Sequence, residues 1–326
     1  MRNILVTGGT GFIGSNLAIA LVREGYRVRI LRREHSDLRA IGDADVEHFI
    51  GDVRDIEALK RAIHGCETVF HTAAVVSYWR RERKMMFDVN IGGTRNVVEA
   101  CLATGVERLI HTSSVAAIGF NPNGHADETN EFNWQTYDVG YRISKYLAEQ
   151  EIRRGLKLGL SAVMVNPSIV IGPRDIHFHG GQIICDVYKK RIFYYPDGGT
   201  NIVYVDDVVR GHIAASRQGR TGERYILAGE NMTNKQMLEG VAEVVGGIKP
   251  VFRISKVLAS GIAATAETVA ALTRTKPWIT RELTTGIDLH LYFSAAKAMR
   301  ELAFKATPFR EGVQQTFRWY RENGLL

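Results

Sequence analysis

Cysteine is scarce in this chain, which has only Cys66, Cys101 and Cys185 in 326 residues. The three lie far apart and none belongs to a Cys-x-x-Cys pair, so they suit neither a disulfide framework nor a zinc site. Two histidines, His177 and His179, lie in a glycine-flanked stretch that indicates a mobile lid rather than a metal site. We therefore expect no metal and a reducing, cytoplasmic environment.

Long apolar runs are also missing. The most apolar stretch, Val257 to Leu272, is interrupted by Glu267 and is too short to cross a bilayer. It indicates a buried or partner-facing helix. The run Arg2 to Val6 already has the character of a strand, so we expect no signal peptide and no membrane insertion.

Acidic residues are outnumbered, because 35 Asp and Glu face 42 Lys and Arg, a formal net charge of +7. The densest basic run, residues 80–84, is not interleaved with stacking aromatics, and no nucleic-acid-binding motif accompanies it. The excess indicates a solvated basic face, part of which can serve an anionic cofactor. We expect no nucleic-acid partner.

What the first half does contain is a regular alternation of short apolar runs with helical patterns. Short continuous apolar runs are typical of parallel strands buried on both faces, so the alternation predicts an α/β fold with a Rossmann-type, doubly wound parallel sheet. The expected strands are 4–6, 26–31, 46–50, 68–71, 108–112 and 161–165. The expected helices are one that ends near residue 24, then 55–64, 87–104 and 137–157.

The pattern changes after residue 166. Loop signals at 172–174 and 180–181 precede a helix that ends near 190, and a turn at 196–199 precedes a strand over 202–205. These segments and the later helices predict a smaller, mostly helical C-terminal lobe. The expected helix caps are Asp206 or Asp207, then a capping box of Thr233 with Gln236, then Ser294.

A glycine-rich loop joins the first strand to the first helix. Gly8 permits a tight turn, Gly11 lets the backbone approach a pyrophosphate, and Gly14 allows close helix–strand packing. A glycine turn without a ligand is the alternative, but the strand–loop–helix context favours dinucleotide binding at the helix N-terminus. The expected contacts in this loop are Gly8, Thr10, Gly11, Phe12, Ile13 and Gly14.

The end of the second strand decides between dinucleotides. An NAD-preferring fold usually places a carboxylate there, on the ribose 2′-hydroxyl, whereas this chain has Arg32 and Arg33. A guanidinium pairs with a 2′-phosphate, so NADP(H) is favoured over NAD(H). The alternative is that both arginines are solvated and that Glu34 or Asp37 plays the acidic part.

Asp52 and Val53 follow the third strand, where the Asp52 carboxylate can reach an adenine amino group. Capping of the helix that starts at Asp55 is the alternative, and both roles are compatible. We expect residues 1–166 plus about 201–228 to form the NADP-binding Rossmann domain. About 167–200 and 229–326 would form the substrate-binding lobe.

Tyr141 and Lys145 are the catalytic candidates. Their spacing of four places both side chains on one helix face, where an ammonium favours the phenolate and so lowers the pKa of the tyrosine. Ser113 and Ser114 follow the fifth strand, at the carboxyl edge where open α/β sheets bind ligands. A serine hydroxyl there can hold a substrate oxygen while Tyr141 exchanges its proton.

These motifs resemble those of the extended short-chain dehydrogenase/reductases of the NAD-dependent epimerase/dehydratase superfamily. Within it the chain is similar to the dihydroflavonol-4-reductase-like branch and to bacterial proteins called hopanoid-associated sugar epimerases. The resemblance covers nearly the whole chain. It rests on residues 7–14, 51–55, 71–74, Asn90 with Gly93 and Thr94, 113–114, Tyr141 with Lys145, 166–168, 172–175 and 222–227.

The resemblance implies roles for further residues. Ser114, Tyr141 and Lys145 match the catalytic residues of the family, and Asn90 matches the structural asparagine beside them. It also implies a homodimer formed through the helices at 87–104 and 137–157. The residues that it adds to the dinucleotide site are Ala73, Ala74, Pro167 and Ser168, with Tyr141 and Lys145 contacting the cofactor as well.

One departure from the family pattern concerns the stretch 199–205. Nucleotide-sugar epimerases usually carry an arginine there that grips a diphosphate, and this chain has none. We therefore expect an NADP(H)-dependent oxidoreductase that reduces a ketone or aldehyde, or oxidises the matching alcohol, by the Ser-Tyr-Lys mechanism and has a small-molecule substrate. The alternatives are a nucleotide-sugar epimerase or dehydratase and a dinucleotide-sensing module, although sensing needs no Ser-Tyr-Lys set.

Overall fold

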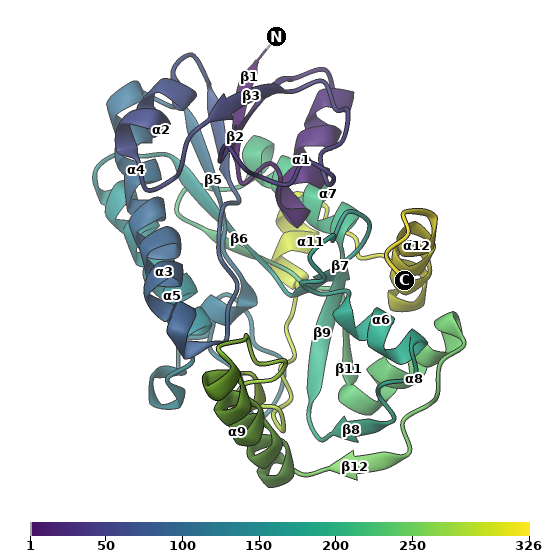
Figure 1. Cartoon of the computed structure of the whole chain (residues 1–326). Coiled ribbons are helices and arrows are strands. Elements are labelled where there is room, and N and C mark those ends of the chain that lie inside the picture. The colour runs from purple at the N-terminus through teal and green to yellow at the C-terminus, as the bar shows by residue number, and fades with distance from the viewer. Residues whose placement is uncertain (1) are drawn as a thin grey trace.

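The computed structural model describes residues 2–326 and is built around a seven-stranded parallel sheet (Figure 1). The strand order is β10-β6-β5-β4-β1-β2-β3. The order reverses between β1 and β4, and in open α/β sheets the ligand crevice lies outside the strand ends at such a point. The strands are β1 (Asn3–Thr7), β2 (Arg27–Arg32), β3 (Glu47–Ile50), β4 (Thr68–His71), β5 (Arg108–Thr112), β6 (Ala162–Pro167) and β10 (Arg224–Leu227).

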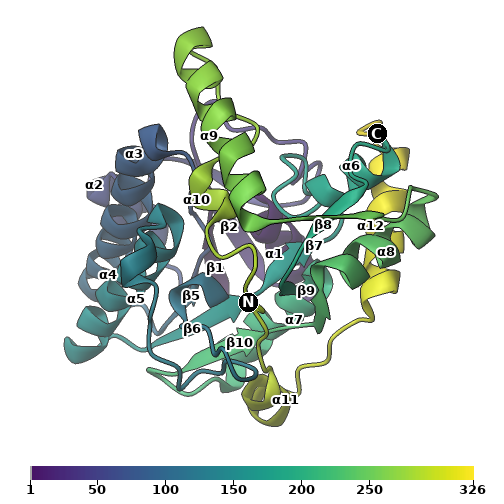
Figure 2. The same ribbon diagram turned by 90° about the horizontal axis from the view of Figure 1, so that it is seen from below.

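Helices cover both faces of this sheet, which is why its central strands are continuous apolar runs. On one face α1 (Phe12–Arg23) packs against α7 (Val205–Gln218). On the other lie α2 (Ile56–Ile63), α4 (Gly93–Thr104) and α5 (Gly140–Lys157), seen together with α3 (Arg83–Phe87) in Figure 2. Each face encloses its own apolar cluster. The Rossmann-type, doubly wound sheet expected from the sequence is confirmed.

The remaining elements form two small sheets with helices beside them. A three-stranded sheet has the order β11-β9-β7, and a two-stranded one pairs β12 with β8. A third apolar cluster lies between the three-stranded sheet and the helices α6, α8 and α12. The elements are β7 (Ile169–Ile171), α6 (Gln182–Tyr188), β8 (Tyr194–Pro196), β9 (Gly199–Tyr204), β11 (Glu230–Thr233), α8 (Asn234–Val245), β12 (Phe252–Ile254), α9 (Lys256–Thr273), α10 (Arg281–Thr284), α11 (Ala296–Leu302) and α12 (Phe309–Glu322).

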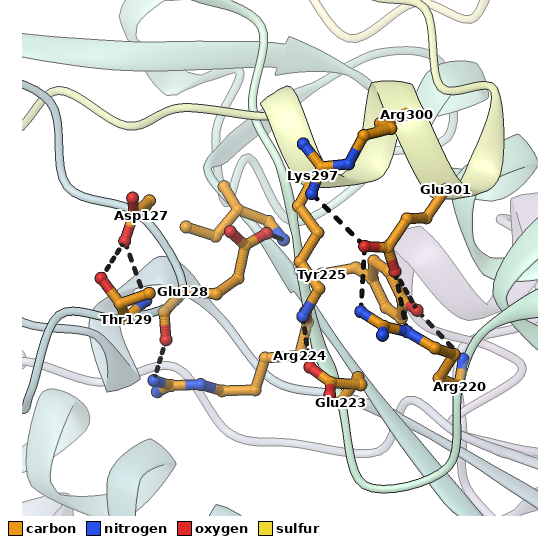
Figure 3. Close-up of polar contacts among 11 residues, drawn as sticks. Asp127, Glu128, Thr129, Arg220, Glu223, Arg224, Tyr225, Lys297, Arg300 and Glu301 are labelled. Carbon is orange, nitrogen blue, oxygen red and sulfur yellow. Dashed lines mark hydrogen bonds and ion pairs between the residues drawn. The ribbon is translucent and has the colours of Figure 1, made fainter.

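A charged network covers the exposed edge of β10 (Figure 3). Glu128, from the loop after β5, accepts a hydrogen bond from the Ile226 N–H at 2.8 Å and its own carbonyl accepts one from Arg224 at 2.5 Å. Lys297 of α11 donates to the Arg224 carbonyl at 2.9 Å and pairs with Glu223. A hollow of ≈ 530 Å³ lies among these groups. The charged side chains of this network form ion pairs largely with one another. They cover the edge of β10 and so prevent another strand from pairing with it.

The sequence located the strands of the main sheet to within about one residue, except β10, which it missed together with β7, β8, β11 and β12. The helix expected over 87–104 is interrupted by a π-helical turn, Asp88–Gly92. The capping box of Thr233 and Gln236 is confirmed. Two caps were wrong.

The first wrong cap concerns α7, whose N-cap is Tyr204. Asp207 is instead buried, where it accepts hydrogen bonds from the main chain and side chain of Thr307. The second concerns α11, whose N-cap is Ala295, although the Ser294 hydroxyl does accept from the Ala296 N–H at 3.3 Å. No helix among residues 2–326 is long and apolar enough to span a membrane.

Candidate active site

The loop after β1 holds its backbone in a shape that only glycine permits. Gly8 has φ +71°, and a Cβ there would lie 2.7 Å from Cα of Ala73 in the neighbouring loop after β4. A Cβ on Gly14 would collide with the carbonyl oxygen of Gly8. The turn and the close helix–strand packing assigned to these glycines from the sequence are therefore present.

The first turn of α1 is open to a ligand. Its N-cap is Gly11, which has no side chain to cap the free N–H groups, and Thr10 and Ile13 beside it are partly exposed. Phe12 is buried against Tyr204. An uncapped helix N-terminus beside a glycine turn fits a pyrophosphate, which accepts hydrogen bonds from such N–H groups.

A second observation also fits a bound dinucleotide. Ser168 follows Pro167, the last residue of β6, and its buried hydroxyl has no hydrogen-bond partner within residues 2–326. A buried hydroxyl without a partner is costly, so a ligand that supplies one would be favoured. Ala73 and Ala74 follow β4 at the same edge of the sheet, and Ala74 is exposed.

The two arginines at the end of β2 differ in their contacts. Arg32 Nε donates to His48 Nδ1 at 2.9 Å, and its guanidinium also reaches the main-chain carbonyl of Glu34 at 3.1 Å. Arg33 is exposed, and its guanidinium makes no hydrogen bond to any described residue. Its charge contributes to lowering the pKa of Asp52. Arg33 is thus the arginine free to bind an added anion.

Asp52 is engaged with Arg54, which donates to its two carboxylate oxygens at 2.9 and 2.7 Å. This pair, more than any other contact, lowers the pKa of Asp52. The alternative role of Asp52 as a helix cap is wrong, because Asp55 caps α2 by accepting from the N–H groups of Glu57 and Ala58. Val53 is buried among the apolar side chains between the sheet and α4.

Ser114 and Tyr141 lie beside one another at the carboxyl end of β5, where the Ser114 hydroxyl acts to lower the pKa of the Tyr141 phenol. The Ser114 hydroxyl also accepts from the Ala116 N–H at 3.1 Å, which fixes its position. Burial raises the pKa of Tyr141 well above its ordinary value, and the Tyr78 ring, 5.7 Å away, adds to this. Ser114 and Arg142 act in the opposite direction. The phenol is therefore protonated at neutral pH.

Lys145 lies one turn further along α5 and is 4% exposed. Its Nζ donates to the main-chain carbonyl of Thr112 at 3.0 Å. Burial lowers its pKa to about 8, while the charge of Glu149 acts to raise it. The acidification of Tyr141 by Lys145 expected from their spacing is not seen in this geometry, because the ammonium is held by β5.

Asn90 lies in the π-helical turn and ties three elements together. Its side chain exchanges two hydrogen bonds with the backbone of Val75, at 2.8 and 2.9 Å. It also donates to the Ser144 hydroxyl at 3.0 Å, next to Lys145 on α5. These contacts tie Asn90 to α5, the helix that contains Tyr141 and Lys145.

Sequence reasoning missed a buried network behind Lys145. Glu149 accepts hydrogen bonds from Ser113 at 2.6 Å and from Asn166 at 2.7 Å. Asn166 also donates to the Ser114 carbonyl at 2.9 Å. The available signal was the acidic residue four positions after Lys145, which lies on the same helix face. Tyr78 and Arg142 were missed as well, and no spacing pattern marks them.

The fold and this site together define the class of extended short-chain dehydrogenase/reductases: a doubly wound sheet, a glycine turn at its switch point, and Ser114, Tyr141 and Lys145 beside it. The chain belongs to the NAD dependent epimerase/dehydratase family, whose sequence profile matches residues 4–228.

Three relatives agree with this assignment, two of them along nearly the full chain. A putative dihydroflavonol 4-reductase of Synechocystis is 33% identical over 98% of this chain and 95% of its own. Sterol demethylase protein B of Methylococcus capsulatus is 32% identical over 99% of both. A ketoreductase of Stigmatella aurantiaca that acts on a farnesyl dihydroquinoline oxide is 31% identical over 68% of this chain and 66% of its own.

Solved structures share the whole fold. The crystal structure of gox2253 is 37% identical, with a TM-score of 0.88 and complete coverage of both chains. The UDP-glucose 4-epimerase of Thermus thermophilus, solved with NAD, is 27% identical, with a TM-score of 0.78 and coverage of 98% of this chain and 99% of its own. The family thus contains both oxidoreductases and epimerases, and its members bind a nicotinamide dinucleotide.

Proposed function

We propose that the protein is an NADP(H)-dependent oxidoreductase that reduces a ketone or aldehyde on an uncharged, largely apolar small molecule. The observation that carries this proposal is the Tyr141 phenol, buried, protonated and lying beside Ser114. A phenol with a raised pKa holds its proton until a stronger base forms beside it. An alkoxide developing from a carbonyl is such a base.

In this mechanism Ser114 holds the substrate oxygen and Tyr141 donates its proton to that oxygen. When bound, NADPH supplies the hydride that adds to the carbonyl carbon. The phenolate left on Tyr141 is stabilised by the Ser114 hydroxyl and the Arg142 guanidinium, the two groups that already favour it. Lys145, with a pKa of about 8, is largely an ammonium at neutral pH and would bind the ribose hydroxyls of the cofactor.

The cofactor preference rests on the charge at the end of β2. Arg33 is exposed and its guanidinium makes no hydrogen bond within residues 2–326, so it can pair with a 2′-phosphate without breaking an existing contact. Arg32 would have to leave His48 first. The Thermus epimerase was solved with NAD, so the proposed preference for NADP(H) rests on the arginines of this chain and not on that neighbour. Asp52 would bind the adenine amino group after releasing Arg54.

The proposed substrate class follows from charge and from the relatives. The strand β9, Gly199–Tyr204, has no arginine to grip a diphosphate, and its Asn201 is buried against Gly229 and Asn231. The names of two relatives refer to a sterol and to a farnesylated ring ketone, which have large apolar parts and no net charge. Both arguments favour a hydrophobic carbonyl compound over a sugar nucleotide.

Epimerisation or dehydration of a nucleotide sugar is the second candidate, favoured by the fold shared with the Thermus epimerase. The test incubates the enzyme with NADPH and a panel of hydrophobic ketones, aldehydes and UDP-sugars. Stoichiometric loss of absorbance at ~340 nm with a carbonyl compound supports reduction. Sugar isomers formed without net cofactor loss would establish the second candidate instead.

Two further expectations belong to this proposal. A homodimer would form through α4 and α5, and light scattering in solution would show twice the chain mass. A reducing compartment is supported by the three cysteines, which are all free and buried. Burial raises the pKa of the Cys66 thiol and so keeps it in the unreactive protonated form.

A further inference from the structure

One helix presents an apolar face that nothing in residues 2–326 covers. The sequence predicted a buried or partner-facing helix here, yet α9 buries only Ala259, Ala263 and Ala270 on one side. On its other side Val257 is 82% exposed and Leu272 is 80% exposed. Figure 2 shows α9 extending away from the main body of the molecule. Such a patch on a folded protein marks an interaction surface.

The exposed side chains form a continuous stripe. Leu258, Ile262, Val269 and Leu272 are all exposed, and their spacing places them on one side of the helix. Trp278, just after the helix, is 72% exposed. An apolar stripe with a tryptophan near its end has the composition of a helix that lies in the interface of a lipid bilayer.

Basic residues flank both ends of this stripe. Arg253 and Lys256 precede it, and Arg274 and Lys276 follow it, whereas residues 249–281 contain a single acid, Glu267. That acid is bonded to Arg281 at 2.7 Å. Arg274 is exposed and makes no ion pair with a described residue. Arg253, Lys256 and Lys276 pair with Asp197, Asp288 and Glu82. Arg274 is therefore the flanking cation that is free to contact an anionic surface.

The segment after α9 is anchored beside the catalytic helix. Lys276 pairs with Glu82 at 2.8 Å, and Glu282 accepts a hydrogen bond at 3.0 Å from the Gly140 N–H, which directly precedes Tyr141. The residues between the stripe and Glu282 therefore connect α9 to α5, the helix that contains Tyr141.

We propose that the α9 face, defined as Leu258, Ile262, Val269 and Leu272, docks on an anionic phospholipid bilayer. The side chains of the face enter the headgroup region and Arg274 contacts lipid phosphates, while no segment spans the membrane. The docking proposal is argued from this surface and does not depend on the proposed function. That it brings an apolar substrate to Tyr141 is a consequence that rests on the proposed function.

The experiment is sedimentation of the full chain with phosphatidylcholine vesicles in which about a third of the lipid is phosphatidylglycerol. We expect wild type to partition onto these vesicles, less at high salt, and to bind weakly to phosphatidylcholine alone. The fourfold variant Leu258→Ser, Ile262→Ser, Val269→Ser, Leu272→Ser should lose at least about tenfold in partitioning. Brominated lipids should quench part of the tryptophan fluorescence of wild type, and this quenched part should be missing in a Trp278→Phe variant, which keeps the other three tryptophans.

The matched control is Leu158→Ser with Met299→Ser, which removes two exposed apolar side chains outside α9 and should bind as wild type does. Unchanged thermal melting and dinucleotide affinity would show that the fourfold variant is folded. If the fourfold variant does not fold, the double variant Leu258→Ser with Leu272→Ser is used in its place. Three results would overturn the proposal: no binding to anionic vesicles, equal binding by the variants, or self-association that the variants abolish. None depends on catalysis, so the proposed function can fail separately.

Discussion

Ser113 and Glu149 are joined by a 2.6 Å hydrogen bond in the interior, between the end of β5 and the catalytic helix α5. The bond assigns different tasks to two adjacent serines. Ser113 donates to the carboxylate whose charge acts on Lys145, while the Ser114 hydroxyl lies beside Tyr141 and acts to lower its pKa. The two serines that follow β5 thus contact both Tyr141, the candidate proton donor, and the Glu149 carboxylate.

Tyr141→Phe should lower kcat for carbonyl reduction by a factor of about 10² or more while leaving dinucleotide affinity nearly unchanged, because only the transferable proton is lost. Lys145→Ala should impair both, since Lys145 is assigned ribose binding as well. Steady-state kinetics and calorimetric titration measure the two effects. Retention of more than about a tenth of wild-type kcat by Tyr141→Phe would show that another group is the acid.

Glu149→Gln should shift the alkaline limb of the pH–rate profile to lower pH. The pKa of Lys145 is about 8, and the charge of Glu149 acts to raise it, so removing that charge lowers the pKa further. The amide preserves the size of the side chain. The control is Glu151→Gln on the same helix, whose carboxylate pairs with Arg95 and Arg154. A profile that moves equally in both variants, or in neither, would remove Glu149 from this role.

Arg33→Ala should weaken NADPH binding about ten- to a hundredfold and leave NADH binding unchanged, because a charge-assisted contact to the 2′-phosphate is worth roughly 1.5–3 kcal/mol. Arg32→Ala should have a smaller effect, since Arg32 is held by His48. Arg27→Ala, at the other end of β2, is the matched control. Tighter binding of NADH than NADPH by wild type would contradict the preference.

Three histidines, His71, His111 and His212, are buried and should make the fold sensitive to acid. Burial lowers the pKa of His71 from 6.5 to about 3 and that of His212 to about 4. As pH falls below 6.5 the unfolded chain binds protons that the folded chain excludes, so stability decreases through this window. Each histidine would cost about 2–3 kcal/mol by about pH 4.5.

Urea unfolding across pH 4–7 measures this dependence. His71→Asn should be less stable at neutral pH, because the ring bridges Thr7 at 2.7 Å and Thr94 at 3.0 Å. Its stability should nevertheless fall less steeply with acid than that of wild type. Equal slopes for the two proteins would mean that His71 is not responsible.

The sheet was predictable because parallel strands such as β1, β4 and β5 are buried on both faces and are therefore apolar at successive positions. The glycine loop was predictable because local geometry requires Gly8 and Gly14. Tyr141 and Lys145 were found because their spacing is itself a helical relationship. Glu149 and Asn166 were not, since a buried polar network depends on contacts between distant elements.

The remaining misses have similar causes. β10 is only four residues long. It is stabilised by pairing with β6 and by the hydrogen bond from Ile226 to Glu128, and neither contact leaves a local pattern in the sequence. The π-helical turn carrying Asn90 reads as ordinary helix in the sequence. Exposure of α9 was equally hidden, because an apolar helix shows the same pattern whether it is buried or awaits a partner.

Transfer of deuterium tests the central claim most directly. The enzyme is incubated with NADPH carrying deuterium on the transferable position of C4 and with a hydrophobic ketone, and the product is examined by mass spectrometry. The account predicts one deuterium on the new carbinol carbon, one NADP⁺ per alcohol formed, and loss of both in Tyr141→Phe. Failure to reduce any carbonyl compound, together with isomerisation of a UDP-sugar at constant cofactor, would contradict it.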